Sequence, residues 1–224
     1  MMDWSPILIS MKTASLSILI TFFAGLLIAW LIIKIKNDSV KIVLDGIFTL
    51  PLVLPPTVVG FFLLYIFGVR GPIGSFFVEF FAYKIAFSWP ATVIAAVVMS
   101  FPLMYRSARG AFEQVDTNLL DAGRTLGMSE WKIFWKVLFA NALPGIISGG
   151  ILAYARGLGE FGATAMLAGN IAGQTRTLPM AVYSDVAAGN MGSAFNYVVV
   201  IVVIAFIAIS IMDYIAIRQD RQWK

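Results

Sequence analysis

The stretch Ala14–Ile33, ASLSILITFFAGLLIAWLII, contains no charged residue and decides the fold class of this chain. A transmembrane α-helix needs about 20 consecutive, mostly apolar residues to cross the hydrocarbon core of a bilayer. A helix on the surface of a soluble domain would carry a charged face, which this run lacks. The stretch therefore predicts a membrane-spanning helix, retained near the N-terminus rather than removed as a signal peptide.

Four further uncharged runs are long enough for tilted transmembrane helices: Gly46–Val69, Ile85–Tyr105, Val137–Ala155 and Val186–Met212. We expect the first part of the last run, VAAGNMGSAFN, to lie outside the lipid. The chain is 60% hydrophobic and 12% charged, whereas soluble domains average about 25% charged residues. These features predict an all-α polytopic membrane protein with about five spans, forming a single domain over residues 1–224.

The segment Arg156–Asp185 leaves the number of spans open. Its uncharged part, Phe161–Thr175, is rich in Gly and Ala and short for a span. It could be a re-entrant segment or a continuation of the fourth helix, and six spans are the alternative if it crosses. Irregular backbone at membrane depth needs protein or a water-filled cavity around it.

Positive charge predicts the orientation, because cytoplasmic loops of membrane proteins are enriched in Lys and Arg. With the N-terminus outside, the cytoplasmic side would carry Lys34, Lys36, Lys41, Arg106, Arg109, Arg124, Lys132, Lys136, Arg218, Arg221 and Lys224. The external side would carry Lys12, Arg70, Lys84 and Arg176. This imbalance predicts an external N-terminus and a cytoplasmic C-terminus.

The residue inventory restricts the chemistry that this chain could perform. There is no cysteine and no histidine, which removes Cys/His metal sites and histidine-activated nucleophiles. The sequence also lacks a G-x-x-x-x-G-K-[ST] phosphate-binding loop. We therefore expect no catalytic residue, no metal site and no ATP hydrolysis by this chain itself.

A polar island, Leu119–Leu138 (LLDAGRTLGMSEWKIFWKVL), interrupts the apolar chain on the predicted cytoplasmic side. Asn118 is expected to cap a short helix, with Asp121 three residues later as a variant of the capping box. Gly127 is expected just past that helix, in the left-handed conformation. Ser129 is expected to cap a second helix that leads into the fourth span.

Three interpretations of this island compete. An apolar stripe at helical spacing runs through Leu119, Leu120, Ala122, Gly123 and Leu126. The stripe could lie on the bilayer as an amphipathic linker, or it could insert into a groove of a cytoplasmic partner. A nucleic-acid-binding helix-turn-helix is disfavoured, because the cations are scattered and membrane spans flank the island closely.

Within the island, DAGRTLG resembles the E-A-A-x-x-x-G signature of the cytoplasmic loop of ABC importer permeases. Asp121 replaces the Glu, Gly123 replaces the second Ala, and the Leu-Pro that usually follows is shifted to Leu143–Pro144. The resemblance implies an ATPase-coupling loop at about 109–136. Its coupling residues would be Asp121, Ala122, Gly123, Gly127, Met128 and Ser129.

Other stretches extend the resemblance to nearly the whole chain: LPLVLPPTVVGFFLL (50–64), SFPLMYRSARGAFEQVD (100–116), RGLGEFGATAMLAGNI (156–171) and QTRTLP (174–179). These are similar to molybdate/tungstate ABC transporter permeases, and sulfate permeases share the GEFGA block. The resemblance implies a type I ABC importer fold in a prokaryotic cell membrane. It also implies a homodimeric pathway, two cytoplasmic ATPases that bind ATP-Mg, and an extracytoplasmic molybdate-binding protein, with no cofactor or nucleic acid on this chain.

The candidate pathway residues lie around prolines and glycines. Pro51, Pro55, Pro56 and Gly60 predict a kinked second span, which is either a packing kink or a place where freed carbonyls and Thr57 line the pathway. Gly157, Gly159 and Gly162 allow close helix approach, as at a dimer interface or a gate. The full candidate set is Pro55, Pro56, Thr57, Gly60, Gly157, Gly159, Phe161, Gly162 and Thr164.

Charged residues near the external side also have two interpretations. Arg156 and Glu160 are spaced i, i+4 and predict an ion pair, the alternative being direct contact of Arg156 with an oxyanion. Arg70 and Arg176 are either solvated loop charges or contacts for a binding protein or a dianion. Alternatives for the whole chain are a tungstate or sulfate/thiosulfate ABC permease and, in a different class, a secondary transporter that works without ATP.

Overall fold

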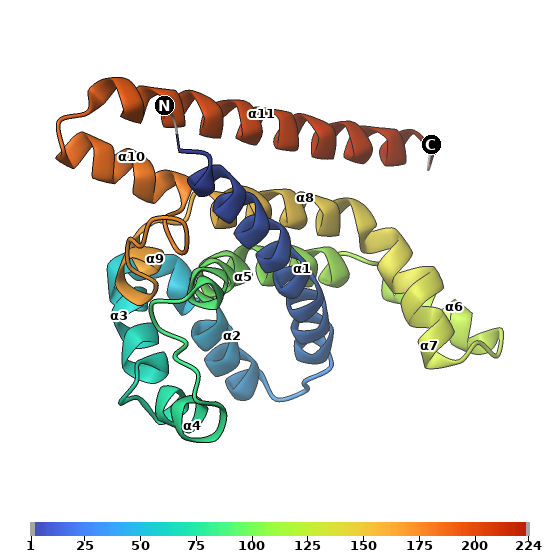
Figure 1. Cartoon of the computed structure of the whole chain (residues 1–224). Coiled ribbons are helices and arrows are strands. Elements are labelled where there is room, and N and C mark those ends of the chain that lie inside the picture. The colour runs from blue at the N-terminus through green and yellow to red at the C-terminus, as the bar shows by residue number, and fades with distance from the viewer. Residues whose placement is uncertain (1–2, 223–224) are drawn as a thin grey trace.

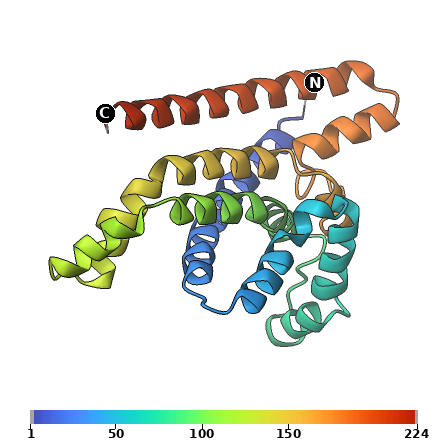
Figure 2. The same ribbon diagram turned by 180° about the vertical axis from the view of Figure 1, so that it is seen from behind.

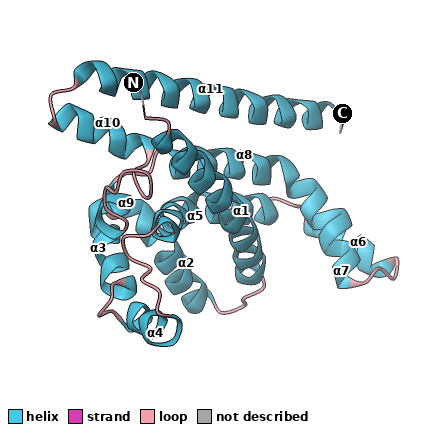
Figure 3. Ribbon diagram, viewed as in Figure 1, coloured by secondary structure: helices cyan, strands magenta, loops and turns pink. Residues whose placement is uncertain are grey.

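A computed structural model describes residues 3–222, and every regular element in that range is helical (Figures 1 and 3). The helices are α1 Ser5–Ile33, α2 Asp38–Val53, α3 Pro56–Phe67, α4 Pro72–Phe81, α5 Trp89–Glu113, α6 Thr117–Thr125, α7 Glu130–Ile133, η1 Phe134–Leu138, α8 Phe139–Leu158, α9 Gly162–Leu167, α10 Leu178–Ala187 and α11 Met191–Gln222. Lys224, counted above among the cytoplasmic cations, lies outside the described residues. The all-α prediction is confirmed.

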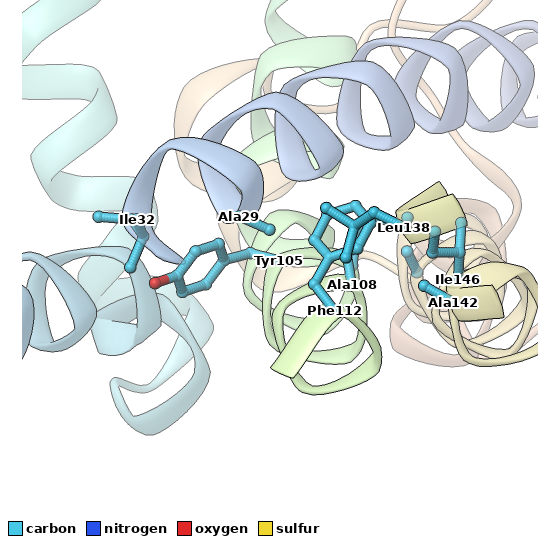
Figure 4. Close-up of a cluster of buried hydrophobic side chains, with 10 residues drawn as sticks. Ala29, Ile32, Tyr105, Ala108, Phe112, Leu138, Ala142 and Ile146 are labelled. Atoms are coloured by element: carbon cyan, nitrogen blue, oxygen red, sulfur yellow. The ribbon is translucent and has the colours of Figure 1, made fainter. Parts of the chain in front are cut away.

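Helices α1, α5 and α8 form the centre of the molecule, where α5 packs against both of the others (Figures 1 and 2). The close-up in Figure 4 shows the side chains between them. Gly25 permits the close approach of α1 to α5, since a Cβ there would lie 2.7 Å from Cγ of Met104. The buried cluster comprises Ala29, Ile32, Met104, Tyr105, Ala108, Phe112, Leu138, Ala142, Ile146 and Ala153.

Hydroxyl groups add directional contacts between α1 and α5. Thr13 and Thr92 are hydrogen-bonded at 2.8 Å, and Thr21 and Ser100 at 3.1 Å, all in the interior. Small and hydroxylated residues are the usual contacts between membrane helices, because lipid supplies no hydrophobic force to hold the helices together. The α1–α5 pair is thereby fixed in register as well as in spacing.

The second apolar run is not a single helix. Helices α2 and α3 meet at an angle of 113°, with the break at Leu54 and Pro55. Leu54 has the extended conformation that a residue before proline favours, and Pro55 has no backbone N–H to continue the helix. The prediction that the prolines kink or locally open this run is therefore confirmed, and the turn divides the run into two helices.

The segment after α8 does not contain a sixth span. Helix α8 ends at Leu158, so the segment does not continue the fourth helix. Helices α9 and α10, of 6 and 10 residues, are too short to cross a bilayer. Four helices of residues 3–222 are long and apolar enough to span, or five if the bent α2–α3 pair counts as one. The count agrees with about five spans.

Two helix ends differ from the expected runs. Helix α11 begins at Met191, within the stretch VAAGNMGSAFN that we expected outside the lipid. Helix α5 continues past Tyr105 to Glu113, so the cytoplasmic loop does not begin at Arg106. Arg106 and Arg109 are consequently helical residues of a spanning element rather than loop residues.

The packing of α3 on α9 gives a first prediction. A Cβ added at Gly60 would lie 2.8 Å from both Cα of Ala163 and Cβ of Met166, whereas one at Gly46 would meet nothing within 4 Å. We expect Gly60→Ala to lower the unfolding temperature in detergent, at a cost of about 1–3 kcal/mol. Gly46→Ala is the matched control and should leave it unchanged or raised. Equal unfolding temperatures for the two variants would refute this account of the packing.

Candidate coupling element and pathway

The residue that caps the N-terminus of helix α6 lies two positions earlier in the chain than predicted from the sequence. The side chain of Asp116 accepts a hydrogen bond from the backbone N–H of Asn118 at 2.9 Å and is the N-cap. Asn118 therefore lies inside the helix, and its predicted role as the cap is wrong. Asp121 does not complete a capping box either, because its carboxylate accepts a hydrogen bond from Arg124 at 2.7 Å.

The turn after α6 has the predicted geometry. Gly127 has a φ of +71°, which is strained for residues with a side chain. The N–H of Met128 donates to the carbonyl of Gly123 at 3.1 Å, and the N–H of Gly127 donates to the carbonyl of Arg124 at 2.9 Å. These two hydrogen bonds define a Schellman motif, which closes the helix C-terminus.

The second helix is capped by Ser129, as predicted. Its side chain accepts a hydrogen bond from the N–H of Lys132 at 3.4 Å. Helix α7 then passes through the single π turn η1 directly into α8. Residues Glu130–Leu158 thus form a continuous helical run that connects the turn to the centre of the molecule.

Arg124 ties the two helices of the island together, a role that the sequence analysis missed. Its guanidinium donates to Asp121 on its own helix and, at 2.8 Å, to Glu130 on α7. Gly123 lies at the same contact between α6 and α7, since a Cβ there would lie 3.2 Å from Cγ1 of Ile133.

The expected apolar stripe of α6 is only partly covered. Gly123 is buried and Leu120 half-buried, but Leu126 is 81% exposed and Leu119 46% exposed. Figures 1 and 2 show α6 and α7 projecting from the body of the molecule. An exposed apolar surface on a projecting element is typical of a site that binds a partner. We call residues 116–133 the projecting element.

The candidate pathway residues divide into covered and exposed groups. Gly162 packs on α3, where a Cβ would lie 2.8 Å from Cβ of Pro56. Together with Gly60 it lets α9 lie against α3 within one chain. Gly157 faces Ser17 of α1, with a Cβ-to-Oγ distance of 3.3 Å. The close approach of these glycines is therefore an intrachain contact.

The remaining candidates do not converge on one point. Pro55, Thr57 and Gly159 are exposed, whereas Thr164 is buried. Phe161 stacks near Tyr183 of α10, with ring centroids 5.1 Å apart. A role of these residues in a pathway or gate stays a prediction.

Arg156 and Glu160 form the predicted ion pair, with Nη1 and Oε2 2.6 Å apart. The Glu160 side chain is 1% exposed and that of Arg156 28%. The second carboxylate oxygen of Glu160 accepts a hydrogen bond from the N–H of Ala163 at 2.8 Å. Glu160 thus also satisfies a free N–H at the start of α9, a role that the spacing did not reveal.

A charge network between α2 and α5 was also missed. Arg109 contacts Asp45 and lies 2.9 Å from Glu113, and Lys41 lies 3.0 Å from the same Glu113 oxygen. Tyr105 donates a hydrogen bond to Asp45. The i, i+4 spacings 41/45 and 109/113 were a visible signal, but only the fold brings α2 beside α5.

On the predicted external side, Arg70 is exposed, and Arg176 donates a hydrogen bond to the side chain of Asn170 at 2.7 Å. A contact of either arginine with a binding protein or a dianion stays a prediction.

Apolar spanning helices around a tight α1–α5–α8 centre, with a projecting helix–glycine–helix element, define a multi-pass helical membrane protein. The chain belongs to the family of binding-protein-dependent transport system inner membrane components, whose pattern matches residues 6–221.

Similar proteins and solved structures agree with this assignment. The chain is 43% identical to the molybdenum transport system permease protein ModB of Escherichia coli K12, over 96% of this chain and 93% of that protein. It is 42% identical to the putative molybdenum transport system permease protein YvgM of Bacillus subtilis, over 91% and 89%. The fold resembles a chain of the inward-facing MetNI methionine ABC transporter, with a TM-score of 0.74 at 18% identity over 96% of this chain and 94% of that one. A bacterial alginate ABC importer gives a TM-score of 0.79 at 13% identity, over 96% and 78%.

The buried carboxylate of Glu160 gives a second prediction. Arg156→Met would leave that charge uncompensated, at a typical cost of about 3–5 kcal/mol. We expect a marked fall in unfolding temperature in detergent. Adding Glu160→Gln should restore most of it, because the amide oxygen still accepts from Ala163 without a charge. A double variant no more stable than Arg156→Met alone would contradict the pairing.

Proposed function

We propose that this chain is the membrane subunit of an ATP-driven importer for molybdate. The observation that carries the proposal is the similarity to molybdenum transport permeases over nearly the full length of both chains. Two copies would form the translocation pathway between them. The exposed apolar faces of α11 and α2, which include Val202, Phe206 and Ile42, leave ample surface for lipid and for a second copy.

The projecting element would couple this pathway to cytoplasmic ATPases. The sequence has no phosphate-binding loop of its own, so a partner would bind ATP-Mg and hydrolyse it. Asp121 and Ala122 are exposed and would contact the partner, as would Leu126. Gly123 and Met128 turn inward and would set the shape of the element.

Gly127 and Ser129 would fix the turn through backbone conformation and capping. The element continues rigidly into α8 through Glu130–Leu158. Closure of an ATPase dimer would therefore move α8, and with it the tightly packed α5, as a rigid body.

An extracytoplasmic binding protein would select the anion and deliver it to the external side. Tungstate is a chemically equivalent cargo, and sulfate or thiosulfate is the next candidate because the GEFGA block at 159–163 is shared with sulfate permeases. A secondary transporter would leave the projecting element without a role. The permease interpretation accounts for that element and for the family.

Uptake by the reconstituted complex tests the proposed function. We expect ATP-dependent accumulation of molybdate in proteoliposomes that contain this chain, its ATPase and its binding protein. Excess tungstate should compete strongly and excess sulfate weakly. Uptake driven by an ion gradient without nucleotide would refute the importer, and preferential competition by sulfate would reassign the cargo.

Gly127→Val tests the coupling role. A β-branched residue at a φ of +71° costs about 1–2 kcal/mol or more and should unwind the turn. We expect normal membrane insertion but loss of copurification with the ATPase. Gly189→Val is a matched control, since Gly189 has a φ of +77° in the turn between α10 and α11. Retention of the ATPase by Gly127→Val, or its loss from both variants, would contradict docking through this turn.

A further inference from the structure

Arg106 is a charged side chain within a spanning helix. Helix α5 continues to Glu113, so at 1.5 Å per residue Arg106 lies about 10 Å before its end. Its side chain is exposed on the surface of the single chain. Among the side chains that the structure describes, it has no partner within 4.0 Å that would form an ion pair. A charged group on a spanning helix cannot face lipid cheaply, so water, protein or an anion must meet Arg106.

The charged neighbours of Arg106 are engaged with one another. Lys41, Asp45, Arg109 and Glu113 carry two positive and two negative charges and are paired across α2 and α5. Further along, the carboxylate of Asp116 accepts the capping hydrogen bond of α6. The network is therefore neutral, and Arg106 and Asp116 are the two charged residues in the wall of the larger cavity, without an ion pair between them.

Arg106 borders two polar cavities. The larger, about 570 Å³, lies between α5 and α8, and the smaller, about 370 Å³, lies between α5 and α2. Gly110 is in the wall of both, one turn along from Arg106. The polar residues that line the larger cavity are Arg106, Ser107, Gln114, Asp116, Asn141 and Ser148.

Several of these polar groups are free to donate. No hydrogen bond is formed by the side chains of Ser107, Gln114 or Ser148 within the described chain, whereas Asn141 donates to the carbonyl of Val137 at 2.7 Å. Guanidinium and hydroxyl groups match the oxygen atoms of a tetrahedral oxyanion, and the guanidinium can bind two of them at once. A single arginine with neutral donors, and with the carboxylate of Asp116 in the same cavity wall, would hold a dianion weakly, which suits a pathway that must release what it admits.

We propose that Arg106, with Ser107, forms a transient binding site for a tetrahedral divalent oxyanion in the larger cavity, at the cytoplasmic end of the pathway. The site deepens the proposed function and rests on it for the identity of the anion. It lies on α5 and α8, the two helices that flank the projecting element. Movement of that element would therefore displace the groups around Arg106 together with α5 and α8.

Cysteine chemistry tests the charge at this site directly, because the chain has no cysteine of its own. Ser148→Cys places one thiol in the wall of the larger cavity, in the assembled complex with its ATPase in lipid nanodiscs. The anionic sulfonatoethyl and the cationic trimethylammonioethyl methanethiosulfonates are compared by the mass of the permease chain. We expect Arg106 to favour the anionic reagent roughly three- to tenfold, as a unit charge a few ångströms away in water should.

The companion variants, each made in the Ser148→Cys chain, separate charge from structure. Arg106→Gln should remove the preference for the anionic reagent and the protection of the introduced thiol by added molybdate. Arg106→Lys should keep the preference, and Lys36→Gln, which removes an exposed loop cation on the same predicted side, should change neither. If Arg106→Gln leaves both the preference and the protection intact, the site is refuted. A preference that depends on Arg106 without protection by molybdate, tungstate or sulfate would also overturn the anion site, and would assign the arginine to a lipid headgroup or to the second copy.

Uptake by the same preparations distinguishes this inference from the function on which it rests. One outcome would refute the anion site but leave the proposed function standing. In it, the unmodified chain takes up molybdate with ATP, but the preference of the introduced thiol for the anionic reagent does not depend on Arg106. Protection of the introduced thiol by sulfate rather than molybdate, with sulfate as the transported anion, would overturn the cargo but keep the anion site. We expect Arg106→Gln to slow molybdate uptake about tenfold while copurification with the ATPase is unchanged.

Discussion

In a bilayer the backbone finds no water, so every N–H and C=O must be hydrogen-bonded within the protein. This constraint makes each long apolar run of the chain helical and permits a break only beside protecting structure. The 113° turn between α2 and α3 obeys it, because α9 packs against α3 there and Gly162 lies against Pro56. In the α1–α5–α8 centre the backbone groups are paired within each helix, and hydroxyl groups of α1 and α5 hydrogen-bond one another between the two helices.

The same centre explains how a short cytoplasmic element could control a pathway. The two helices of the projecting element are held together at their turn, through the Schellman motif at Gly127 and the Arg124 link to Glu130. It leaves the body on α5 and returns on α8, and these helices are packed closely along their length. A displacement of the element would therefore move both helices together, along with the charges on α5.

Local chemistry predicted some features of the site and failed at others for definite reasons. The turn at Gly127 and the cap at Ser129 were predicted correctly, because a left-handed turn and a helix cap depend on groups within a few residues. The prediction that Asn118 caps α6 was wrong, because the charged carboxylate of Asp116 caps the start of this helix instead. The links of Arg124 to Glu130 and of Glu160 to Ala163 were not predicted, since each crosses a break between helices whose angle the sequence does not specify.

The sequence by itself determined the class of protein, the approximate number of spans and the form of the projecting element, because run length and capping are local properties. Only the tertiary structure decided that α2 and α3 part at Pro55 and that Glu160 is buried. It also decided that Arg106 belongs to a spanning helix with its charge unpaired within the described chain. A prediction from the length of the uncharged run ends α5 before its first charged residue, Arg106. In the structure α5 packs against α1 and α8 and continues to Glu113. Whether a charge is paired depends on which helices become neighbours, and that is a property of the fold.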